Sequence, residues 1–484
     1  MSKLQNSSPA TIRSTGWKIL SDNNGGSWRG LLAAGNAARF LVITGGVALH
    51  AVSIYVVATI MPTVVADLGG LNFFAWTTTL YVAGSLTGAA AVPLVLGRTS
   101  PRAAYRFAFG LFLLGSLACA TAPSMVILLL GRPAQGLGGG MLTALAYATV
   151  RQMFPPSLHA RAITLFGSVW GIAAVIGPAI GGLFAQYATT LGGWRGAFVA
   201  DLLIGGLFLV LGERALPANR EEASTGRFPG LRLMLLASAA LAVSAGGLSG
   251  QARDSLIGIV AAAVLVVVVL WLDGRAPHRL LPKGAFNPLV PLGAVSATIG
   301  FMILSYSPGP FVPYLLQAGH GATPIVAGYV SAIMALTWTG AAIATASLTR
   351  RGIRMSIAVG PPLMLAGMLI SAWAMSSGPV LFIVVGQALS GIGIGLGWSH
   401  LCALLMEVAP PEARASAGPF ITTTQTLASV FGSAIAGMVA NLAGLPTATT
   451  PDAIAATAAV LFGALALFPL IGTFLAWQTL RLTK

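Results

Sequence analysis

The sequence predicts an all-α membrane protein, and its composition is the first observation behind that prediction. Of its 484 residues, 56% are hydrophobic and only 8% are charged, whereas about a quarter of the residues in an average soluble domain carry a charge. Sixty glycines and 28 prolines indicate the same class, because both residues are more frequent in membrane helices than in soluble ones.

Long apolar runs are the second observation, because a helix needs roughly 20 residues to cross the hydrocarbon of a bilayer. Fourteen such runs follow one another along the chain. We expect transmembrane helices over residues 39–61, 74–96, 103–122, 124–149, 162–185, 194–212, 230–249, 255–272, 288–308, 323–347, 355–375, 379–406, 415–440 and 456–479. An even number of crossings returns both ends of the chain to the same side of the membrane.

The positions of Lys and Arg predict which side that is. A net charge of +15 would suit nucleic acid if it gathered on one face, but the basic residues lie in alternate loops, which is the positive-inside pattern. Most basic residues follow the second, fourth, sixth, eighth, tenth and twelfth runs or lie at the end of the chain. They are Arg98, Arg102, Arg106, Arg151, Arg161, Arg214, Arg220, Arg227, Arg232, Arg275, Arg279, Lys283, Arg350, Arg351, Arg354, Arg414, Arg481 and Lys484. The intervening loops hold only Arg195 and Arg253. We therefore expect both termini in the cytoplasm, an inner or plasma membrane location, and no nucleic-acid partner.

An internal repeat predicts the domain organisation. The stretch Phe154–Ala162 matches Ala409–Ala417 with an offset of 255 residues, from Pro155 to Pro410, and the same offset relates Gly136 to Gly391 and several other glycines. We expect a polar cytoplasmic tail over 1–38, because its composition and the long run after it do not fit a cleaved signal peptide. The expected domains that follow are a six-helix bundle over 39–212, a linker with an inserted helix pair over 213–287, and a second six-helix bundle with a short tail over 288–484.

The fifth predicted helix contains the run Gly171-Ile-Ala-Ala-Val-Ile-Gly-Pro-Ala-Ile-Gly-Gly182. Small residues let neighbouring membrane helices approach closely, and neighbouring helices can absorb the bend that a proline introduces. The motif residues are Gly171, Gly177, Pro178, Gly181 and Gly182. They closely resemble the antiporter motif on the fifth helix of drug exporters in the major facilitator superfamily. The fourteen-helix layout is similar to the larger branch of drug:proton antiporters in that superfamily.

This resemblance implies the major facilitator fold, with two six-helix bundles, two inserted helices and a substrate site between the halves. It also implies a proton-coupled antiporter that exports small organic molecules by alternating access, as in multidrug efflux. The expected partners are the lipid bilayer, a small-molecule substrate and protons, and we expect a monomer. Two alternatives stay open: export or import of a specific neutral or anionic metabolite, siderophore-like or lipid-like, and a membrane receptor that transports nothing.

Three ionisable residues inside the predicted helices are candidates for proton coupling. Arg132 opens an Arg-x-x-Gln-Gly motif to which the resemblance assigns that role, and a guanidinium in a membrane must face water, a partner or a substrate. Asp201 lies about two turns into the sixth helix, where low dielectric raises the pKa of a carboxyl group; similar proteins commonly have Asn there. A histidine side chain ordinarily titrates near neutral pH, so His50 could replace the aspartate that such exporters carry on their first helix. The simpler role for Arg132 is extension of its side chain to the outer membrane interface. For Asp201 it is a structural ion pair with Arg132 or Arg195, or a position close to the interface, and for His50 an ordinary hydrogen bond.

Aromatic and polar side chains near the expected central cavity are candidates for substrate binding, because aromatic rings stack on ligands and attract cations. They are Tyr55, Trp76, Tyr81, Gln135, Trp170, Gln387, Trp398 and His400. Gln387 occupies the repeat position of Arg132, so the buried charge is expected in one half only. The stretch Ser307–Pro313 is expected to break the ninth helix, either as a gate or as a plain turn.

The resemblance further implies a cytoplasmic gate after the second and tenth helices. Its expected residues are Arg98, Arg102, Arg350 and Arg354. The acids that normally accompany such arginines are missing, since Gly97 stands at the usual aspartate position. We therefore expect a weaker latch, or one built differently.

Other kinds of chemistry have little support in the sequence. It contains no nucleotide fingerprint, metal-ligand cluster or nucleophile constellation, so we expect no enzyme activity, no cofactor and no metal. The glycines of Gly136–Gly140 lie inside a predicted membrane helix rather than after a strand, which argues against a phosphate loop. Cys119 and Cys402 fall in apolar runs, and we expect both to be small buried side chains rather than a disulfide.

Overall fold

The computed structural model describes residues 36–154, 156–187, 192–219, 230–276, 282–285, 287–410 and 414–483, which form α-helices joined by turns. The first half contains α3 (Ala37–Leu68), α4 (Phe74–Arg98), α5 (Pro101–Ala120), α6 (Met125–Met153), α7 (Pro156–Gln186) and α8 (Gly193–Ala215). An inserted pair follows, α9 (Gly230–Gly246) and α10 (Ala252–Arg275). The second half contains α11 (Pro291–Leu304), α12 (Val312–His320), α13 (Pro324–Thr345), α14 (Arg350–Ser377), α15 (Val380–Val408), α16 (Arg414–Leu442), α17 (Pro451–Leu465) and α18 (Leu467–Leu482).

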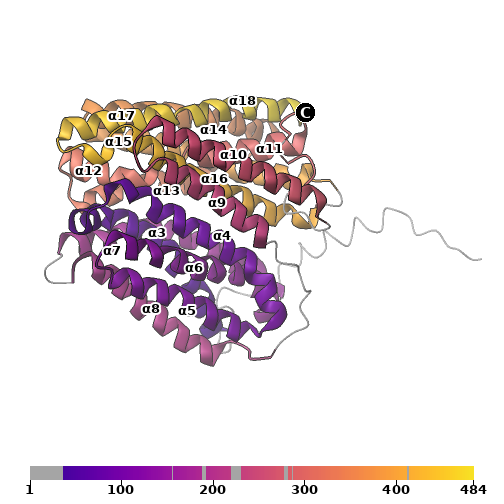
Figure 1. Cartoon of the computed structure of the whole chain (residues 1–484). Helices are drawn as coiled ribbons and strands as arrows, with labels where there is room; N and C mark the ends of the chain where they lie inside the picture. Colours follow the sequence, from indigo (N-terminus) through magenta and orange to yellow (C-terminus); the bar gives the residue numbers. More distant parts are fainter. Residues whose placement is uncertain are drawn as a thin grey trace, which may run out of the picture.

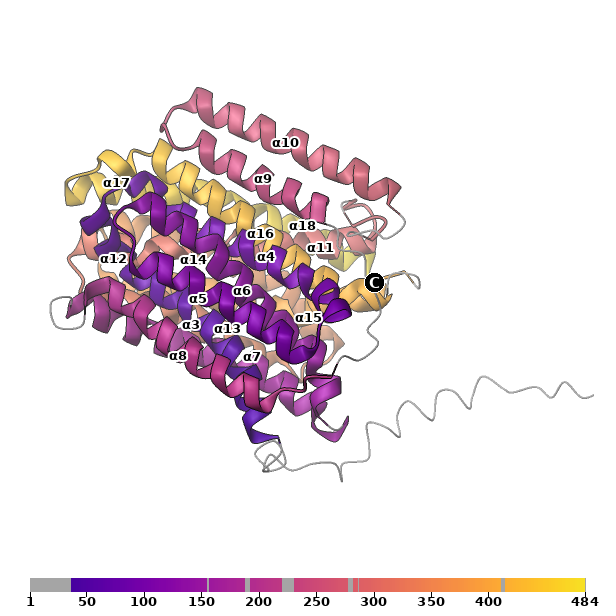
Figure 2. The same ribbon diagram turned by 60° about the horizontal axis from the view of Figure 1, so that its bottom comes forward.

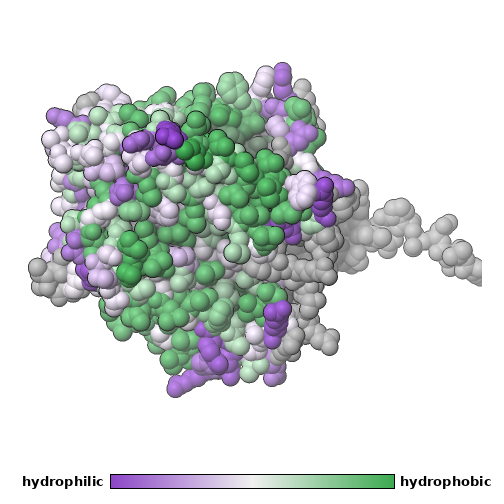
Figure 3. Space-filling view, viewed as in Figure 1, coloured by the Kyte–Doolittle hydropathy of each residue, from purple (hydrophilic) through white to green (hydrophobic). Residues whose placement is uncertain are grey.

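The helices pack side by side in two bundles. Figure 1 shows α3–α8 below and the second half above, and Figure 2 shows α9 and α10 at the edge of the assembly. In the described residues, 13 helical segments are long and apolar enough to cross a membrane, and α9, with 17 residues, is a shorter apolar helix. A broad apolar surface crosses the middle of the molecule in Figure 3, with most hydrophilic residues near its edges. The predicted all-α membrane fold is confirmed.

Two of the predicted spans are broken in the structure. The ninth span extends from Pro291 to His320: α11 ends at Leu304, and a 3-10 turn over Gly309–Phe311 leads into α12. Prolines in this stretch lack the N–H that an α-helix needs, so the predicted break is confirmed, although the span is longer than expected. The last span bends at Ala466 between α17 and α18.

Side-chain caps and prolines set several helix starts. A Ser or Thr hydroxyl accepts a hydrogen bond from the backbone N–H three residues later, and a proline follows the cap, where its missing N–H does no harm. The pairs are Ser100-Pro101, Thr323-Pro324 and Thr450-Pro451. Glycines with positive φ, such as Gly69 and Gly321, form turns at one end of the bundle.

The sequence repeat reappears in the packing of the two halves. Glycine has no Cβ atom, so the distance from an added Cβ atom to its neighbours measures how closely another helix approaches. An added Cβ atom at Gly136 would lie 2.0 Å from the Tyr81 carbonyl oxygen, and one at Gly391 would lie 2.1 Å from the Met334 carbonyl oxygen. Since Gly136 and Gly391 are related by the repeat, α6 approaches α4 in the first half as α15 approaches α13 in the second. Both contacts are too close for any residue except glycine.

The two halves meet at the end of the molecule that holds the Gly69 turn, which we call the Gly69 end. There Phe74 stacks on Phe311 with ring centroids 4.8 Å apart, and the Asn441 side-chain amide donates to the Asn72 carbonyl at 2.9 Å. The opposite end carries Arg98, Arg214, Arg350 and Arg481, and we call it the basic end.

The inserted pair attaches to both halves. Small side chains of α9, including Ala239 and Ala240, pack in one apolar cluster with Ala83 of α4 and Ala434 of α16. A Cβ atom at Gly247, just after α9, would lie 2.7 Å from the Met438 Cα atom. An ion pair between Arg232 and Asp273 links α9 to α10. The pair therefore lies across the boundary between α4 and α16.

Close glycine packing gives a first prediction. A Cβ atom at Gly88 would lie 2.1 Å from the Leu137 carbonyl oxygen, so Gly88→Ala has to push α4 away from α6, and overpacking costs about 1–3 kcal/mol. Gly206 of α8 has nothing within 4 Å of such a Cβ atom, so Gly206→Ala should be neutral or slightly stabilising. Thermal unfolding in detergent compares the two variants, and equal midpoints would contradict a close approach of α4 to α6 at Gly88.

Candidate functional site

A polar cluster lies inside the first half, and the side-chain amide of Gln135 is its centre. Gln135 Nε2 lies 3.0 Å from Asp201 Oδ2, 2.9 Å from Ser116 Oγ and 3.3 Å from Ser53 Oγ. Ser53 Oγ also donates to Asp201 Oδ2 at 3.2 Å. Helices α3, α5, α6 and α8 therefore meet at one amide group. We call Ser53, Ser116, Arg132, Gln135 and Asp201 the Gln135 cluster.

Arg132 completes the cluster from one turn earlier on α6. Its Nη1 donates to Gln135 Oε1, and its Nε donates to the Thr77 carbonyl at 3.0 Å. The guanidinium carbon lies 4.0 Å from the centroid of the Tyr81 ring, a cation–π contact. Only 2% of Arg132 is exposed, so the side chain does not extend to the membrane surface.

Asp201 and Arg132 are connected through Gln135 rather than by a direct ion pair. Among the described residues, ion pairs occur only at Arg106–Glu213, Arg195–Asp67 and Arg232–Asp273. Arg195, the other expected partner of Asp201, is therefore paired elsewhere. Burying a charge is costly unless it is paired and hydrogen-bonded, and in this cluster one buried acid and one buried base share a single amide.

His50 extends the cluster towards α7. Its Nδ1 lies 2.7 Å from the Tyr81 hydroxyl, and its ring stacks on the Tyr81 ring at 5.4 Å. The Trp170 ring meets the His50 ring edge-on at 5.8 Å. A continuous line of contacts thus runs from Asp201 through Gln135, Arg132, Tyr81 and His50 to Trp170.

A small cavity touches this line at the boundary between the two halves. It has a volume of about 20 Å³, and its lining includes Arg132, Tyr81, Thr77 and Thr78 together with Pro310 of the second half. A cavity needs on the order of 10–15 Å³ to hold one water molecule, so a single water fits. The space is polar on one side and apolar on the other, because Ile54, Val57, Ala58 and Met61 also line it.

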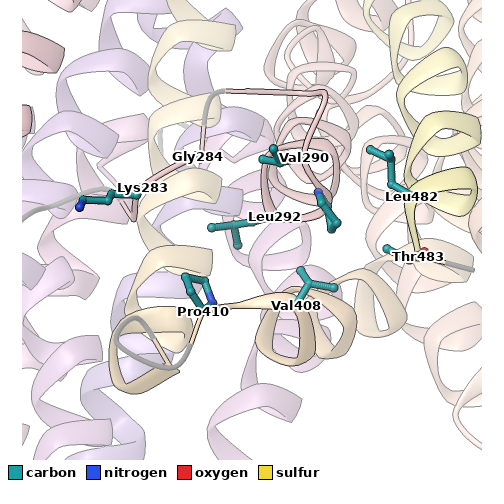
Figure 4. A pocket seen from close by; sticks show the side chains of 9 residues that line it. Lys283, Gly284, Val290, Leu292, Val408, Pro410, Leu482 and Thr483 are labelled. Atoms are coloured by element: carbon teal, nitrogen blue, oxygen red, sulfur yellow. The ribbon is translucent and has the colours of Figure 1, made fainter.

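A larger cavity, of about 580 Å³, lies elsewhere. It opens at the basic end of the second half, between the start of α11 and the ends of α15 and α18, and Leu292, Val408 and Leu482 form apolar walls (Figure 4). Lys283 lies at its rim with its side chain directed away from the other lining residues in that view. None of the residues predicted to bind substrate or protons lines it.

The described residues of the second half form no counterpart of the cluster. Gln387, at the repeat position of Arg132, is buried, with 4% of its surface exposed. Trp398 packs edge-on against Trp338 at 5.5 Å. His400 is also buried, and its Nε2 has no hydrogen-bond partner among the described residues. These three predicted substrate residues lie on α15, whereas Tyr81, Gln135 and Trp170 join the line of contacts in the first half.

Two further aromatic candidates lie outside that line. Tyr55 on α3 packs against the fifth-helix motif, because a Cβ atom at Gly177 would lie 2.4 Å from the Tyr55 Cβ atom. Trp76 packs edge-on against Phe73 at 6.1 Å, and its buried indole N–H has no partner in the described part of the chain.

The fifth-helix motif packs α7 against both halves. A Cβ atom at Gly181 would lie 2.8 Å from the Val56 carbonyl oxygen on α3, and one at Gly182 would lie 2.9 Å from the Ile325 Cα atom on α13. Pro178 lies in the same contact, since a Cβ atom at Gly328 would be 2.8 Å from the Pro178 Cβ atom. Gly171, at the other end of the motif, has only ordinary contacts, with Thr339 at 3.8 Å.

Among the described residues, the four predicted gate arginines form no hydrogen bond or ion pair from one half to the other. Arg102 Nε donates to the Leu216 carbonyl at 2.8 Å, and Arg354 Nη2 donates to the Leu480 carbonyl at 3.1 Å. Arg102 therefore connects α5 to the end of α8 in the first half, and Arg354 connects α14 to the end of α18 in the second half. Arg98 and Arg350 are exposed, and a gating role for the four stays a prediction.

Sequence reasoning missed two members of the cluster, Ser53 and Ser116. Both are completely buried, and a lone Ser in an apolar run carries little signal, because serine also bonds to its own helix backbone. Cys119 and Cys402 are free thiols, the first buried and the second partly buried.

Two six-helix bundles related by a repeat, with a charged cluster enclosed in one of them, define a membrane transporter. Residues 43–433 match the family model of the Major Facilitator Superfamily. A probable multidrug-efflux transporter of Mycobacterium tuberculosis (strain ATCC 25618 / H37Rv) is 36% identical over 431 residues, which cover 86% of this chain and 90% of that protein. The chain therefore belongs to the Major Facilitator Superfamily, and it is a multi-pass membrane transporter rather than an enzyme.

More distant proteins agree with this assignment. Multidrug resistance protein 3 of Bacillus subtilis (strain 168) is 27% identical over 423 residues, covering 84% of this chain and 80% of that protein. The crystal structure of a bacterial homolog of the human lysosomal transporter Spinster, in an inward-facing and occupied conformation, matches with a TM-score of 0.61. That match covers 92% of this chain and 97% of the other at 16% identity, and it indicates a common fold.

Proposed function

We propose that this transporter is a proton-coupled antiporter that exports small organic molecules, and that Asp201 carries the coupled proton. The observation behind this proposal is the enclosed Gln135 cluster, which places an acid with 7% of its surface exposed beside an amide that also holds a buried arginine. The names of the relatives in Mycobacterium and Bacillus support export of drug-like molecules.

The cluster can convert one proton into a change of hydrogen bonds. As a carboxylate, Asp201 Oδ2 accepts from both Ser53 and Gln135. A proton on that oxygen adds a donor and makes the carboxyl group a weaker acceptor, so the hydrogen bonds from Ser53 and Gln135 weaken and the Gln135 amide is freer to reorient. Because the oxygen of the same amide accepts from Arg132, a reorientation weakens that hydrogen bond, and the neutral acid no longer compensates the charge of the guanidinium.

The proposed setting is a plasma membrane with both termini in the cytoplasm and the basic end inside, because positively charged loops stay on that side. With the halves in contact at the Gly69 end, substrate would reach the centre from the cytoplasm. The proposed substrate contacts are Tyr55, Trp76, Tyr81, Gln135, Trp170, Gln387, Trp398 and His400, with His50 and Arg132 assisting proton coupling. The functional unit of this proposal is a monomer.

The lining of the small cavity favours a second candidate function, export of an anionic or neutral metabolite. Among the described residues that line it, Arg132 alone is charged, and the lining also includes Thr77 and Thr78. A cationic substrate would be repelled there unless Asp201 were ionised. The charge of the substrate therefore has to be measured together with the coupling.

The test measures proton movement in reconstituted vesicles that enclose a pH-sensitive dye, with cationic, neutral and anionic compounds added in turn. One class should drive proton movement in the wild type, and Asp201→Asn should abolish it while still exchanging labelled substrate across the membrane. Glu213→Gln is the control, because Glu213 forms an exposed pair with Arg106 and such surface pairs contribute little to stability. Unchanged proton movement in Asp201→Asn would exclude Asp201 as the carrier, and substrate transport without any proton movement would exclude proton coupling.

A further inference from the structure

The inserted helix pair makes the two boundaries between the halves unequal. The first boundary lies between α4 and α16 and the second between α7 and α13, and the sequence repeat relates one to the other. Helix α9 packs over the first boundary through its apolar cluster with α4 and α16, and Figure 2 shows α10 on the outer side of α9. We call the first the covered boundary and the second the open boundary.

The two boundaries also differ in the number of large apolar side chains that their helices expose. Among the described side chains, α4 has no exposed large apolar residue and α16 has only Leu442. Helices α7 and α13 have four each: Ile172, Val175, Ile176, Leu183, Val326, Tyr329, Leu336 and Ile343. The open boundary therefore presents large apolar side chains of the kind that suit a lipid-facing surface, whereas the covered boundary presents almost none.

The open boundary also widens from one end to the other. At the Gly69 end, a Cβ atom at Gly182 would lie 2.5 Å from Ile325 Cγ1, and one at Gly328 would lie 2.8 Å from the Pro178 Cβ atom. Nearer the basic end, a Cβ atom at Gly171 would lie 3.8 Å from Thr339, and nothing comes within 4 Å of one at Gly340. Gly171 therefore leaves more room beside Thr339 than Gly182 leaves beside Ile325, and Thr339 is itself exposed.

The widened part leads to the line of contacts that begins at Asp201. Trp170 precedes Gly171, and its ring meets the ring of His50, which is bonded to Tyr81 beneath the Arg132 guanidinium. A molecule that passes between Gly171 and Thr339 therefore meets an aromatic ring first and a buried charge afterwards. Apolar flanks followed by an aromatic ring suit an amphipathic molecule that dissolves in the bilayer.

We propose that lipophilic substrates pass sideways from the cytoplasmic leaflet into the transporter between α7 and α13, at Gly171 and Thr339, and that the α9–α10 pair closes the equivalent route between α4 and α16. This inference rests on the proposed exporter function. It specifies the substrates as membrane-dissolved amphipathic molecules.

The first test needs no transport. Single cysteines replace Thr339 at the open boundary or Val430, a 1% exposed residue of α16 in the cluster with α9, in a Cys119→Ala, Cys402→Ala background. A maleimide carried on a lipid tail should label Thr339→Cys several-fold faster than Val430→Cys, and a lipophilic diphenylhexatriene cation should slow the labelling of Thr339→Cys. Equal labelling at the two sites, or no protection, would overturn the proposal even if the protein exports.

The second test uses Thr339→Trp, which fills the widened part of the boundary from α13 and leaves the fifth-helix motif unchanged. Export of the membrane-dissolved diphenylhexatriene cation should be lost, while a water-soluble substrate should still drive proton movement. Equal loss for both substrates would mean that the variant blocks the conformational change, and it would count against a lateral route. If the wild type exports neither substrate but Thr339→Cys is labelled and protected as expected, the exporter function fails and the lipid-facing opening stands.

Discussion

Arg132→Leu is expected to abolish coupled transport and to lower the free energy of unfolding by about 3–5 kcal/mol, the usual cost of leaving a buried charge uncompensated. The variant leaves the Asp201 carboxylate inside the first half without a compensating charge. It also frees Gln135 Oε1 and the Thr77 carbonyl, both of which accept hydrogen bonds from Arg132. Vesicle proton movement and thermal unfolding in detergent measure the two effects.

A double variant separates stability from function. Adding Asp201→Asn to Arg132→Leu removes the uncompensated acid and should recover part of the lost stability, because an amide needs no counter-charge. Coupled transport should stay absent, since neither member of the charge pair remains. Arg253→Leu is the matched control, because Arg253 is exposed at the start of α10. Coupled transport at the wild-type rate in Arg132→Leu would contradict a coupling role for the buried pair.

The sequence predicts the membrane-spanning helices and the repeat because each depends on signals within one segment. Apolar length defines a span, and the glycines shared by the two halves, such as Gly136 and Gly391, indicate where helix backbones approach. It also singles out Arg132 and Asp201, since ionisable residues in apolar runs are rare and costly.

The bridge between those two residues could not be predicted in the same way. Gln135 connects them only because the rotation of α6 and α8 about their axes brings its amide to Asp201. Ser116 joins from α5 for the same reason. The rotation of each helix about its axis depends on its packing against several other helices, so it cannot be predicted from the sequence of one segment alone. The sequence therefore predicts which charged residues matter better than it predicts what lies between them.

Gly182→Leu is expected to slow transport strongly by preventing the halves from closing at the Gly69 end. A Cβ atom at Gly182 would lie 2.5 Å from Ile325 Cγ1 and 2.9 Å from its Cα atom. The side chain of Ile325 can rotate, but its backbone cannot move without shifting α13. A leucine therefore fits only when α7 and α13 are further apart at this end, and the closed arrangement becomes the strained one.

The distance between the halves at the Gly69 end measures this effect directly. Spin labels on cysteines at Ala66 and Thr449, which are exposed residues of the first and second half, should report a longer mean distance in Gly182→Leu than in the parent protein. Gly206→Leu is the control, because Gly206 has open space around it and should change neither distance nor transport. An unchanged distance distribution together with unchanged transport in Gly182→Leu would mean that the close contact at Ile325 does not limit closure. A longer distance with slowed transport would show that glycine at this position keeps the closed state accessible.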